Sequence, residues 1–214
     1  MTLAPPASHL RGAVRDYCDY TEHTDRPILR RELPQAQVVV ILNFGAPFRI
    51  LDRHHPGRSR TVGSFAAGVH DQHTVVCSSG TARCVQLNLT PIGAARLLGL
   101  PLGELTNQVV DLPDLLPAAD RHLPERLHAA GTPARRFALL DDWIGQRLSG
   151  AAGPPAPLLQ AWERLRTHHG QYPIGGLAAE LGWSRRHLAT RFREALGLPP
   201  KAMARLLRFE RAVA

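Results

Sequence analysis

The side chains between positions 184 and 193 could recognise a nucleic acid. Arg185, Arg186 and Arg193 carry guanidinium groups, which bind phosphates and donate paired hydrogen bonds to guanine edges. Ala189 and Thr190 lie between them in the sequence. On a helix these five residues would share one outer face, because residues three and four apart are neighbours there. The segment is therefore suited to contact with a DNA duplex.

Two short helices joined by a tight turn would position this face. The first runs from about 174 to 181, and Gly182 suits a helix end with positive φ. Ser184 is a good N-cap for the second helix, which Gly197 ends. The small Ala178 and Ala179 would let the helices approach closely. The expected buried positions are Ile174, Leu177, Ala178, Leu181, Leu188, Phe192, Ala195 and Leu196, together with Leu158, Trp162 and Leu165 of a preceding helix. This pattern predicts a helix-turn-helix.

Histidine and cysteine could supply other chemistry. The metal candidates are His54-His55 and the pair His70 and His73, but a His-x-His with a following Glu is absent and adjacent histidines point to opposite faces of a strand. We therefore expect no metal. His168-His169 are expected to cap a helix C-terminus or face solvent. An odd number of cysteines, Cys18, Cys77 and Cys84, favours buried free thiols over disulfides or a zinc site.

Catalytic patterns are missing from the sequence. Neither GxSxG, HExxH, a P-loop nor GxGxxG occurs. The neighbouring acids Asp141-Asp142 are expected to be exposed on a helix. We therefore expect no enzyme activity and no cofactor.

Positive charge is concentrated at one end of the chain. Residues 158–214 hold ten Lys/Arg and four Asp/Glu, a net +6, whereas the other sixteen Lys/Arg and fourteen Asp/Glu give residues 1–157 only +2. A Gly/Pro/Ala-rich stretch at 149–157 lies between the two parts and resembles a linker. We therefore predict a sensor domain at 1–148 and a basic module at 158–214.

The sensor part shows two kinds of pattern. Between 28 and 90, short apolar runs at 38–42, 48–50, 74–77 and 84–89 are rich in β-branched residues, which predicts an antiparallel sheet or barrel. Between 91 and 148 the pattern becomes helical, with Thr90 and Thr132 as N-caps and Gly99 as a helix end. The region 101–131 is expected to hold short helices and turns. The fold class is therefore α+β, followed by an all-α segment.

Two further features lead us to expect a location in the cytoplasm. The longest apolar stretches fall short of eighteen residues, which predicts no membrane span. The N-terminus lacks the apolar core of a secretory signal.

The basic module resembles the first helix-turn-helix of the AraC/XylS family of transcription regulators. Leu177-Ala178, Gly182-x-Ser184, Leu188, Phe192, Gly197 and the following prolines stand at the offsets of the family pattern, and 204–212 resembles the start of its linker helix. The resemblance places Arg186, Ala189 and Thr190 on the base-facing side. It places Arg185, His187 and Lys201 near phosphates. We expect Ser184 and Arg193 to contact DNA as well. Family members carry a second helix-turn-helix, and this chain ends at Ala214, within or just after the linker helix.

The segments 42–48, 68–71 and 89–99 also resemble sensor domains found on some of these regulators. That resemblance implies a cupin-like barrel that binds a small effector or forms dimer contacts. We therefore expect a sequence-specific DNA-binding regulator whose partners are double-stranded DNA, a small effector and a second copy of the chain. The alternative is a ligand-binding or dimerising protein with a remnant, non-functional DNA-binding half-domain. A cupin-type enzyme is the third hypothesis, and the missing set of metal ligands argues against it.

Overall fold

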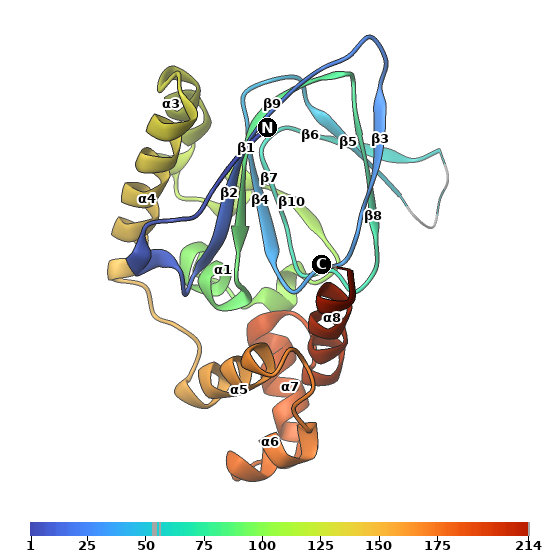
Figure 1. The fold of residues 1–214 in the computed structure, drawn as a ribbon, viewed down its shortest axis with the longest axis vertical. Coiled ribbons are helices and arrows are strands. Elements are labelled where there is room, and N and C mark those ends of the chain that lie inside the picture. Colours follow the sequence, from blue (N-terminus) through green and yellow to red (C-terminus); the bar gives the residue numbers. More distant parts are fainter. Residues whose placement is uncertain (53–54, 56, 214) are drawn as a thin grey trace.

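The computed structural model describes residues 1–52, 55 and 57–213. A β-rich part is followed by helices (Figure 1). The strands of the described residues are β1 Thr2–Ala4, β2 Val14–His23, β3 Ile28–Glu32, β4 Val38–Asn43, β5 Phe48–Leu51, β6 Ser59–Val62, β7 Phe65–Ala67, β8 Thr74–Ser78, β9 Thr81–Leu89 and β10 Val109–Asp111. The helices are α1 Pro91–Leu98, α2 Leu112–Leu115, α3 Leu123–Ala129, α4 Pro133–Ser149, α5 Ala156–Thr167, α6 Ile174–Glu180, α7 Arg185–Leu196 and α8 Pro200–Val213, with 3-10 turns η1 Ser8–Leu10, η2 Leu102–Leu105 and η3 Ala118–Asp120.

The strands form two antiparallel sheets. The larger has the order β1-β2-β9-β4-β7-β10, and the smaller has the order β3-β8-β5-β6. Each pairing in the described part of the chain is antiparallel, from the long β2–β9 pair to the short β7–β10 pair. The predicted α+β class, with an antiparallel β part before a helical end, is confirmed.

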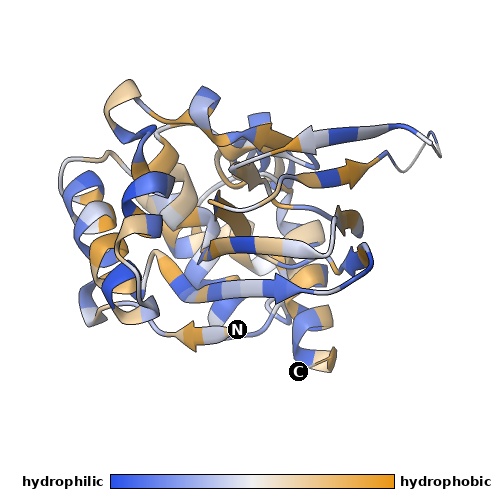
Figure 2. Cartoon of the chain, turned by 90° about the horizontal axis from the view of Figure 1, so that it is seen from above, coloured by the Kyte–Doolittle hydropathy of each residue, from blue (hydrophilic) through white to orange (hydrophobic). Residues whose placement is uncertain are grey.

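Successive side chains of the central strands point to opposite sides of the larger sheet, and both sides are buried. Val38, Val40 and Leu42 of β4 belong to the main core, which also contains residues of α1, α3 and α4. Val39 and Ile41 point the other way, because successive side chains of a strand alternate, and they belong to a second cluster with β5 and β7. Figure 2 shows such changes of hydropathy along strands and helices. The larger sheet therefore separates a helix-covered core from a space between the sheets.

The predicted helix starts in this part are confirmed by their caps. The Thr90 side chain accepts a hydrogen bond from Gly93 N, and the Thr132 side chain accepts one from Arg135 N. Gly99 ends α1 in the left-handed conformation, at φ 68°. These caps satisfy backbone N–H groups that have no partner inside a helix.

Three expectations drawn from the sequence were wrong: the extent of the sheet, the exposure of Asp141 and the first residue of the linker. The sheet extends beyond 28–90, because β1, β2 and β10 lie outside that range. The sequence of β2, VRDYCDYTEH, hides its role because its buried Asp19 and Glu22 are charged and its alternation is therefore masked. Asp141 is not simply exposed: its Oδ1 accepts hydrogen bonds from Tyr17 Oη at 2.8 Å and from Ala7 N at 3.0 Å. Ser149 belongs to α4, and α5 begins at Ala156, so 150–155 alone lie between these helices.

The last four helices share the main core. α5 packs against α7 and α8, and α7 also contacts α6. The buried residues of this segment include Leu158, Ala161, Trp162, Leu165, Leu177, Ala178, Leu188, Phe192, Leu196, Met203, Leu206 and Leu207. Ala178 is buried, as expected of a small residue that lets two helices approach closely. Ala179 is exposed and contributes nothing to that approach. Leu181 and Ile174 are half-buried at the margin of this core.

Candidate nucleic-acid interface

A glycine turn joins α6 to α7. Gly182 has φ +66°, and its N–H donates to Ala179 O, while Trp183 N donates to Ala178 O. These two bonds form the Schellman ending that a left-handed residue permits. Trp183 packs against the core and lies edge-on to His187, with 4.7 Å between the ring centroids. The predicted helix end at Gly182 is confirmed, and Trp183 has a packing role in the turn.

The start and the inner face of α7 follow from its sequence. Ser184 accepts a hydrogen bond from His187 N at 3.1 Å, which caps the helix. Leu188, Phe192 and Leu196 each have no exposed surface. Their spacing of four residues places them on one side of the helix. The opposite side is therefore left to the polar and charged residues.

Exposed cations occupy the outer side of α7. Arg186, Thr190 and Arg193 are exposed, and Ala189 is half-buried between them. Within the part of the chain that the structure describes, neither Arg186 nor Arg193 has an ion-pair partner. Arg191, on the same helix, pairs with Glu194 at 3.1 Å. Two guanidinium groups of α7 are thus available to an external anion.

The remaining predicted contacts are placed differently. The Arg185 side chain lies over α6. A Cβ added to Gly175 of that helix would be 2.6 Å from a guanidinium nitrogen of Arg185. Lys201 is exposed in the first turn of α8. His187 is exposed beside Trp183. The proposed DNA contacts of Ser184, Arg185, His187 and Lys201 stay predictions.

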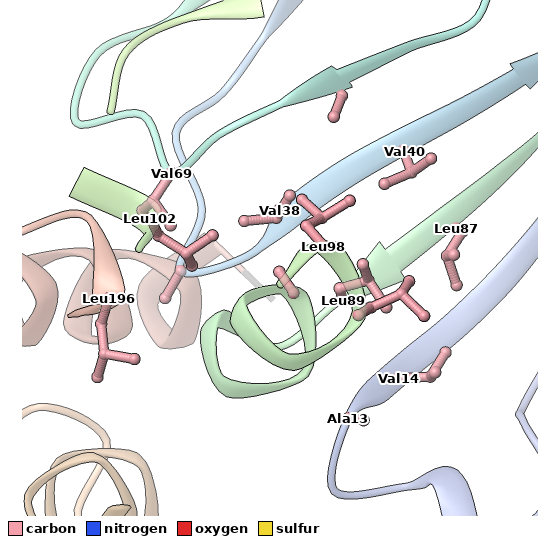
Figure 3. Packing of buried hydrophobic residues seen from close by; sticks show 14 of the residues in the cluster. Ala13, Val14, Val38, Val40, Val69, Leu87, Leu89, Leu98, Leu102 and Leu196 are labelled. Atoms are coloured by element: carbon pink, nitrogen blue, oxygen red, sulfur yellow. The ribbon is translucent and has the colours of Figure 1, made fainter. Parts of the chain in front are cut away.

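The C-terminal end of α7 is docked onto the β-rich part. A Cβ on Gly103 of η2 would lie 3.1 Å from Glu194 O and 3.2 Å from Arg193 O, so the backbones are in close contact. Thr106 Oγ1 donates to Gly197 O at 2.5 Å. Leu196 lies near Leu102 and Val69 (Figure 3). The other end of α7, which carries Arg186 and Thr190, extends away from this contact.

A second contact joins α8 to the β-rich part. Glu210 accepts hydrogen bonds from Ala36 N at 2.5 Å and from Arg15 Nη1 at 3.2 Å. Its side chain is 17% exposed. The sequence gives no sign of this contact, because Glu210 lies 174 residues from Ala36. The segment 33–37 is thereby tied directly to the basic module.

A cavity of about 240 Å³ lies between the two sheets. Its apolar lining comes from Val39, Ile41, Phe48, Ile50, Phe65, Val76 and Val109. Its polar lining includes Gln37, Gln86 and Arg30. Leu33, Pro34 and Gln35, from the segment that contacts α8 through Ala36, also line the cavity. A partly apolar cavity with a few polar groups is typical of a small-molecule site.

Among the residues that the structure describes, the arginine that lines this cavity is Arg30, and it is already paired. The Arg30 guanidinium donates to the Glu22 carboxylate and to the Tyr20 hydroxyl. Burial acts to raise the pKa of Glu22, but hydrogen bonds from Ser78, Tyr20 and Arg30 outweigh it and lower that pKa. Burial and the hydrogen bond to Glu22 raise the pKa of Tyr20 to about 12. Glu22 and Arg30 therefore remain a charged pair at neutral pH.

The histidines and cysteines singled out in the sequence have structural roles where the structure describes them. His54 lies outside the described residues, and among those described no cluster of three or more His, Cys, Asp or Glu side chains could hold a metal. His168 Nδ1 lies 2.9 Å from Arg164 O, at the end of α5, as expected of a capping residue. All three cysteines are free and buried. Burial raises the pKa of Cys84 to about 12, which makes its thiol a poor nucleophile.

Comparison with known protein families identifies the N-terminal part of the chain as a member of one of them. The model of a domain of unknown function, DUF6597, matches residues 2–111. The chain belongs to the DUF6597 family. This domain is the one associated with AraC-type regulators, so an AraC-associated N-terminal β domain is confirmed, and its role as a sensor stays a prediction. No curated protein sequence matches the chain at a significant level.

Solved structures show the fold of this DUF6597 protein as a whole. A crystal structure of apo ToxT from Vibrio cholerae is similar over 92% of this chain and 81% of the ToxT chain, with a TM-score of 0.52 and 10% identity. The AraC-like transcriptional activator CuxR matches over 99% of this chain and 86% of its own, at 16% identity and a TM-score of 0.32. A crystal structure of ToxT bound to an unsaturated fatty acid matches over 89% of this chain and 95% of the ToxT chain, at 8% identity and a TM-score of 0.28. The expected AraC-type fold is confirmed.

No helix of the described residues is long and apolar enough to cross a bilayer.

Proposed function

We propose that this DUF6597 protein is a sequence-specific DNA-binding transcription regulator that is controlled by a small effector bound between its two sheets. The exposed, unpaired guanidinium groups of Arg186 and Arg193 on α7 carry this proposal. A capped helix of this kind fits a major groove, where arginine reads guanine and apolar groups contact the thymine methyl. Arg186, Ala189 and Thr190 are the residues we assign to base contacts. Ser184, Arg185, His187 and Lys201 are assigned to the DNA backbone.

The effector part of the proposal depends on the segment 33–37. This segment lines the cavity through Leu33, Pro34 and Gln35, and its Ala36 N–H is bound by Glu210 of α8. A molecule in the cavity that shifts this segment would therefore also shift α8. Control through dimer contacts of the N-terminal domain stays a prediction.

Selection from randomised duplexes tests the DNA-binding proposal. We expect the purified chain to enrich one short motif, because base contacts add about 1–3 kcal/mol of discrimination each. The alternative, a ligand-binding protein with a non-functional DNA-binding half-domain, predicts weak retention of all sequences and no enrichment. In the same selection, an Ala189→Ser chain should enrich an altered motif at a single base step. Enrichment without such a shift would remove Ala189 from the base-facing set.

Removal of the Glu210 carboxylate tests the link between the two parts. In a Glu210→Ala chain, Ala36 N–H and Arg15 lose their shared acceptor. We expect a loss of about 1–2 kcal/mol in the free energy of unfolding and faster amide hydrogen exchange confined to α8 and to 33–37. Hydrogen exchange followed by mass spectrometry measures both.

The matched control is Glu163→Ala, which removes an exposed partner of Arg166 within α5. That change should leave the exchange of α8 unaltered. Equal exchange of α8 in the Glu210→Ala chain and the unmodified chain would contradict the assigned coupling.

A further inference from the structure

The cavity between the sheets combines an apolar wall with oriented amide groups. Asp16 Oδ1 accepts a hydrogen bond from Asn88 Nδ2 at 2.6 Å, which fixes the orientation of that amide. Asn88 Oδ1 then accepts from Gln86 Nε2 at 2.9 Å and from Gln37 Nε2 at 3.4 Å. Gln37 and Gln86 both line the cavity.

The orientation of Asn88 decides what the two glutamines can offer a ligand. An ionised Asp16 only accepts hydrogen bonds, so Asn88 must turn its nitrogen toward it and its oxygen toward the glutamines. Each glutamine therefore binds Asn88 through one of the two N–H groups of its side-chain nitrogen. In the described part of the chain, no protein donor reaches Oε1 of Gln37 or Gln86. The cavity thus offers two neighbouring acceptor oxygens, which favour a hydrogen-bond donor and repel an anion.

The charges around the cavity also disfavour an anion. Arg30 is bonded to Glu22, and Glu32 lies near it on the same strand and lines the cavity as well. An incoming carboxylate would meet two carboxylates, Glu22 and Glu32, against the single guanidinium of Arg30, and would be repelled by the excess negative charge.

The volume limits the size of the occupant. An engineered apolar cavity of about 150 Å³ holds benzene. On that scale a cavity of about 240 Å³ holds about ten non-hydrogen atoms.

We infer that the effector is a neutral, largely apolar molecule of about ten non-hydrogen atoms that donates a hydrogen bond from a hydroxyl or N–H group to Gln37 and Gln86. Its apolar part contacts Ile41, Ile50 and Phe65. This inference rests on the effector part of the proposed function and is independent of DNA binding.

Three probes of equal size test the inference. 1-Nonanol carries a hydroxyl donor, 1-methoxyoctane carries only an acceptor, and octanoate is an anion, and each has about ten non-hydrogen atoms, matched to the cavity. We expect 1-nonanol to bind about 5–10-fold more tightly than 1-methoxyoctane, the ratio given by one net hydrogen bond. Octanoate should bind more weakly than either. Isothermal titration calorimetry on the full chain gives the three dissociation constants.

A Gln86→Met chain provides the second measurement. Met matches glutamine in length but cannot accept the bond, so the preference for 1-nonanol over 1-methoxyoctane should fall to about twofold or less. Gln146→Met, an exposed change on α4, should leave the preference intact. The thermal unfolding transition of each variant shows whether it is folded before it is titrated.

Each outcome has a defined meaning. Tightest binding by octanoate, or equal binding of 1-nonanol and 1-methoxyoctane, would overturn the inferred ligand class. A failure of all three probes to bind would overturn the inference too. None of these results affects DNA binding, which is measured separately with duplexes, so failure of the ligand class and failure of the regulator function are distinguishable.

Discussion

Replacing Arg186 and Arg193 together by alanine is expected to weaken duplex binding by roughly a hundredfold. Each arginine removes one charge-assisted contact with a phosphate or a guanine, and such contacts contribute about 1–3 kcal/mol each. Both side chains are exposed and project from the solvent side of α7, so the change should leave folding intact. Fluorescence anisotropy with the selected duplex at a fixed salt concentration measures the two affinities.

Arg191→Ala is the control on the same helix. Its guanidinium is bound to Glu194 within the helix rather than available to DNA. We expect a change in affinity of about threefold or less, which is the effect of losing long-range attraction at physiological salt. A loss as large as that of the double variant would mean that net charge, and not the outer face of α7, determines binding.

Replacing Asp19 by alanine is expected to reduce the free energy of unfolding by about 3–5 kcal/mol. The Asp19 carboxylate accepts a hydrogen bond from Arg136 Nη1 at 2.6 Å, and the two side chains are only 8% and 3% exposed. Arg136 also donates to Leu127 O and Gly131 O, at the end of α3 and in the following turn. The ion pair between Asp19 and Arg136 therefore connects β2 to α3 and α4. Its loss leaves a buried, unpaired guanidinium.

Urea denaturation measures this change, with Glu194→Ala as the control for an exposed ion pair. That control should cost about 0.5 kcal/mol or less. An Asp19→Ala, Arg136→Leu double variant should be less destabilised than the sum of the two single variants, because it removes the unpaired charge. Additive effects would show that the two side chains do not depend on each other.

The helix-turn-helix was predictable because its signals are local. The Ser184 cap, the Gly182 turn and the spacing of Leu188, Phe192 and Leu196 lie within fifteen residues, and each acts on the chain next to it. The same holds for Thr90 with α1 and Thr132 with α4. Surface exposure of Arg186 and Arg193 then follows from the burial of the opposite face.

Features that depend on distant partners were not predictable. β2 contains Asp19 and Glu22, whose burial makes sense only with Arg136 and Arg30, so its sequence resembles a solvated segment. Asp141 meets Tyr17 across 124 residues. The orientation of Arg185 over Gly175 and the bond of Glu210 to Ala36 are likewise decided by tertiary packing. Such pairs carry no periodic signal.

The most direct test of the DNA-binding account is the salt dependence of duplex affinity. Each phosphate contact releases counterions and adds about −0.9 to the slope of log affinity against log salt concentration. We predict a steep slope for the unmodified chain and a slope shallower by about 1–2 for the Arg186→Ala, Arg193→Ala variant. Identical slopes for the two chains would contradict the claim that the outer face of α7 is the surface that contacts DNA.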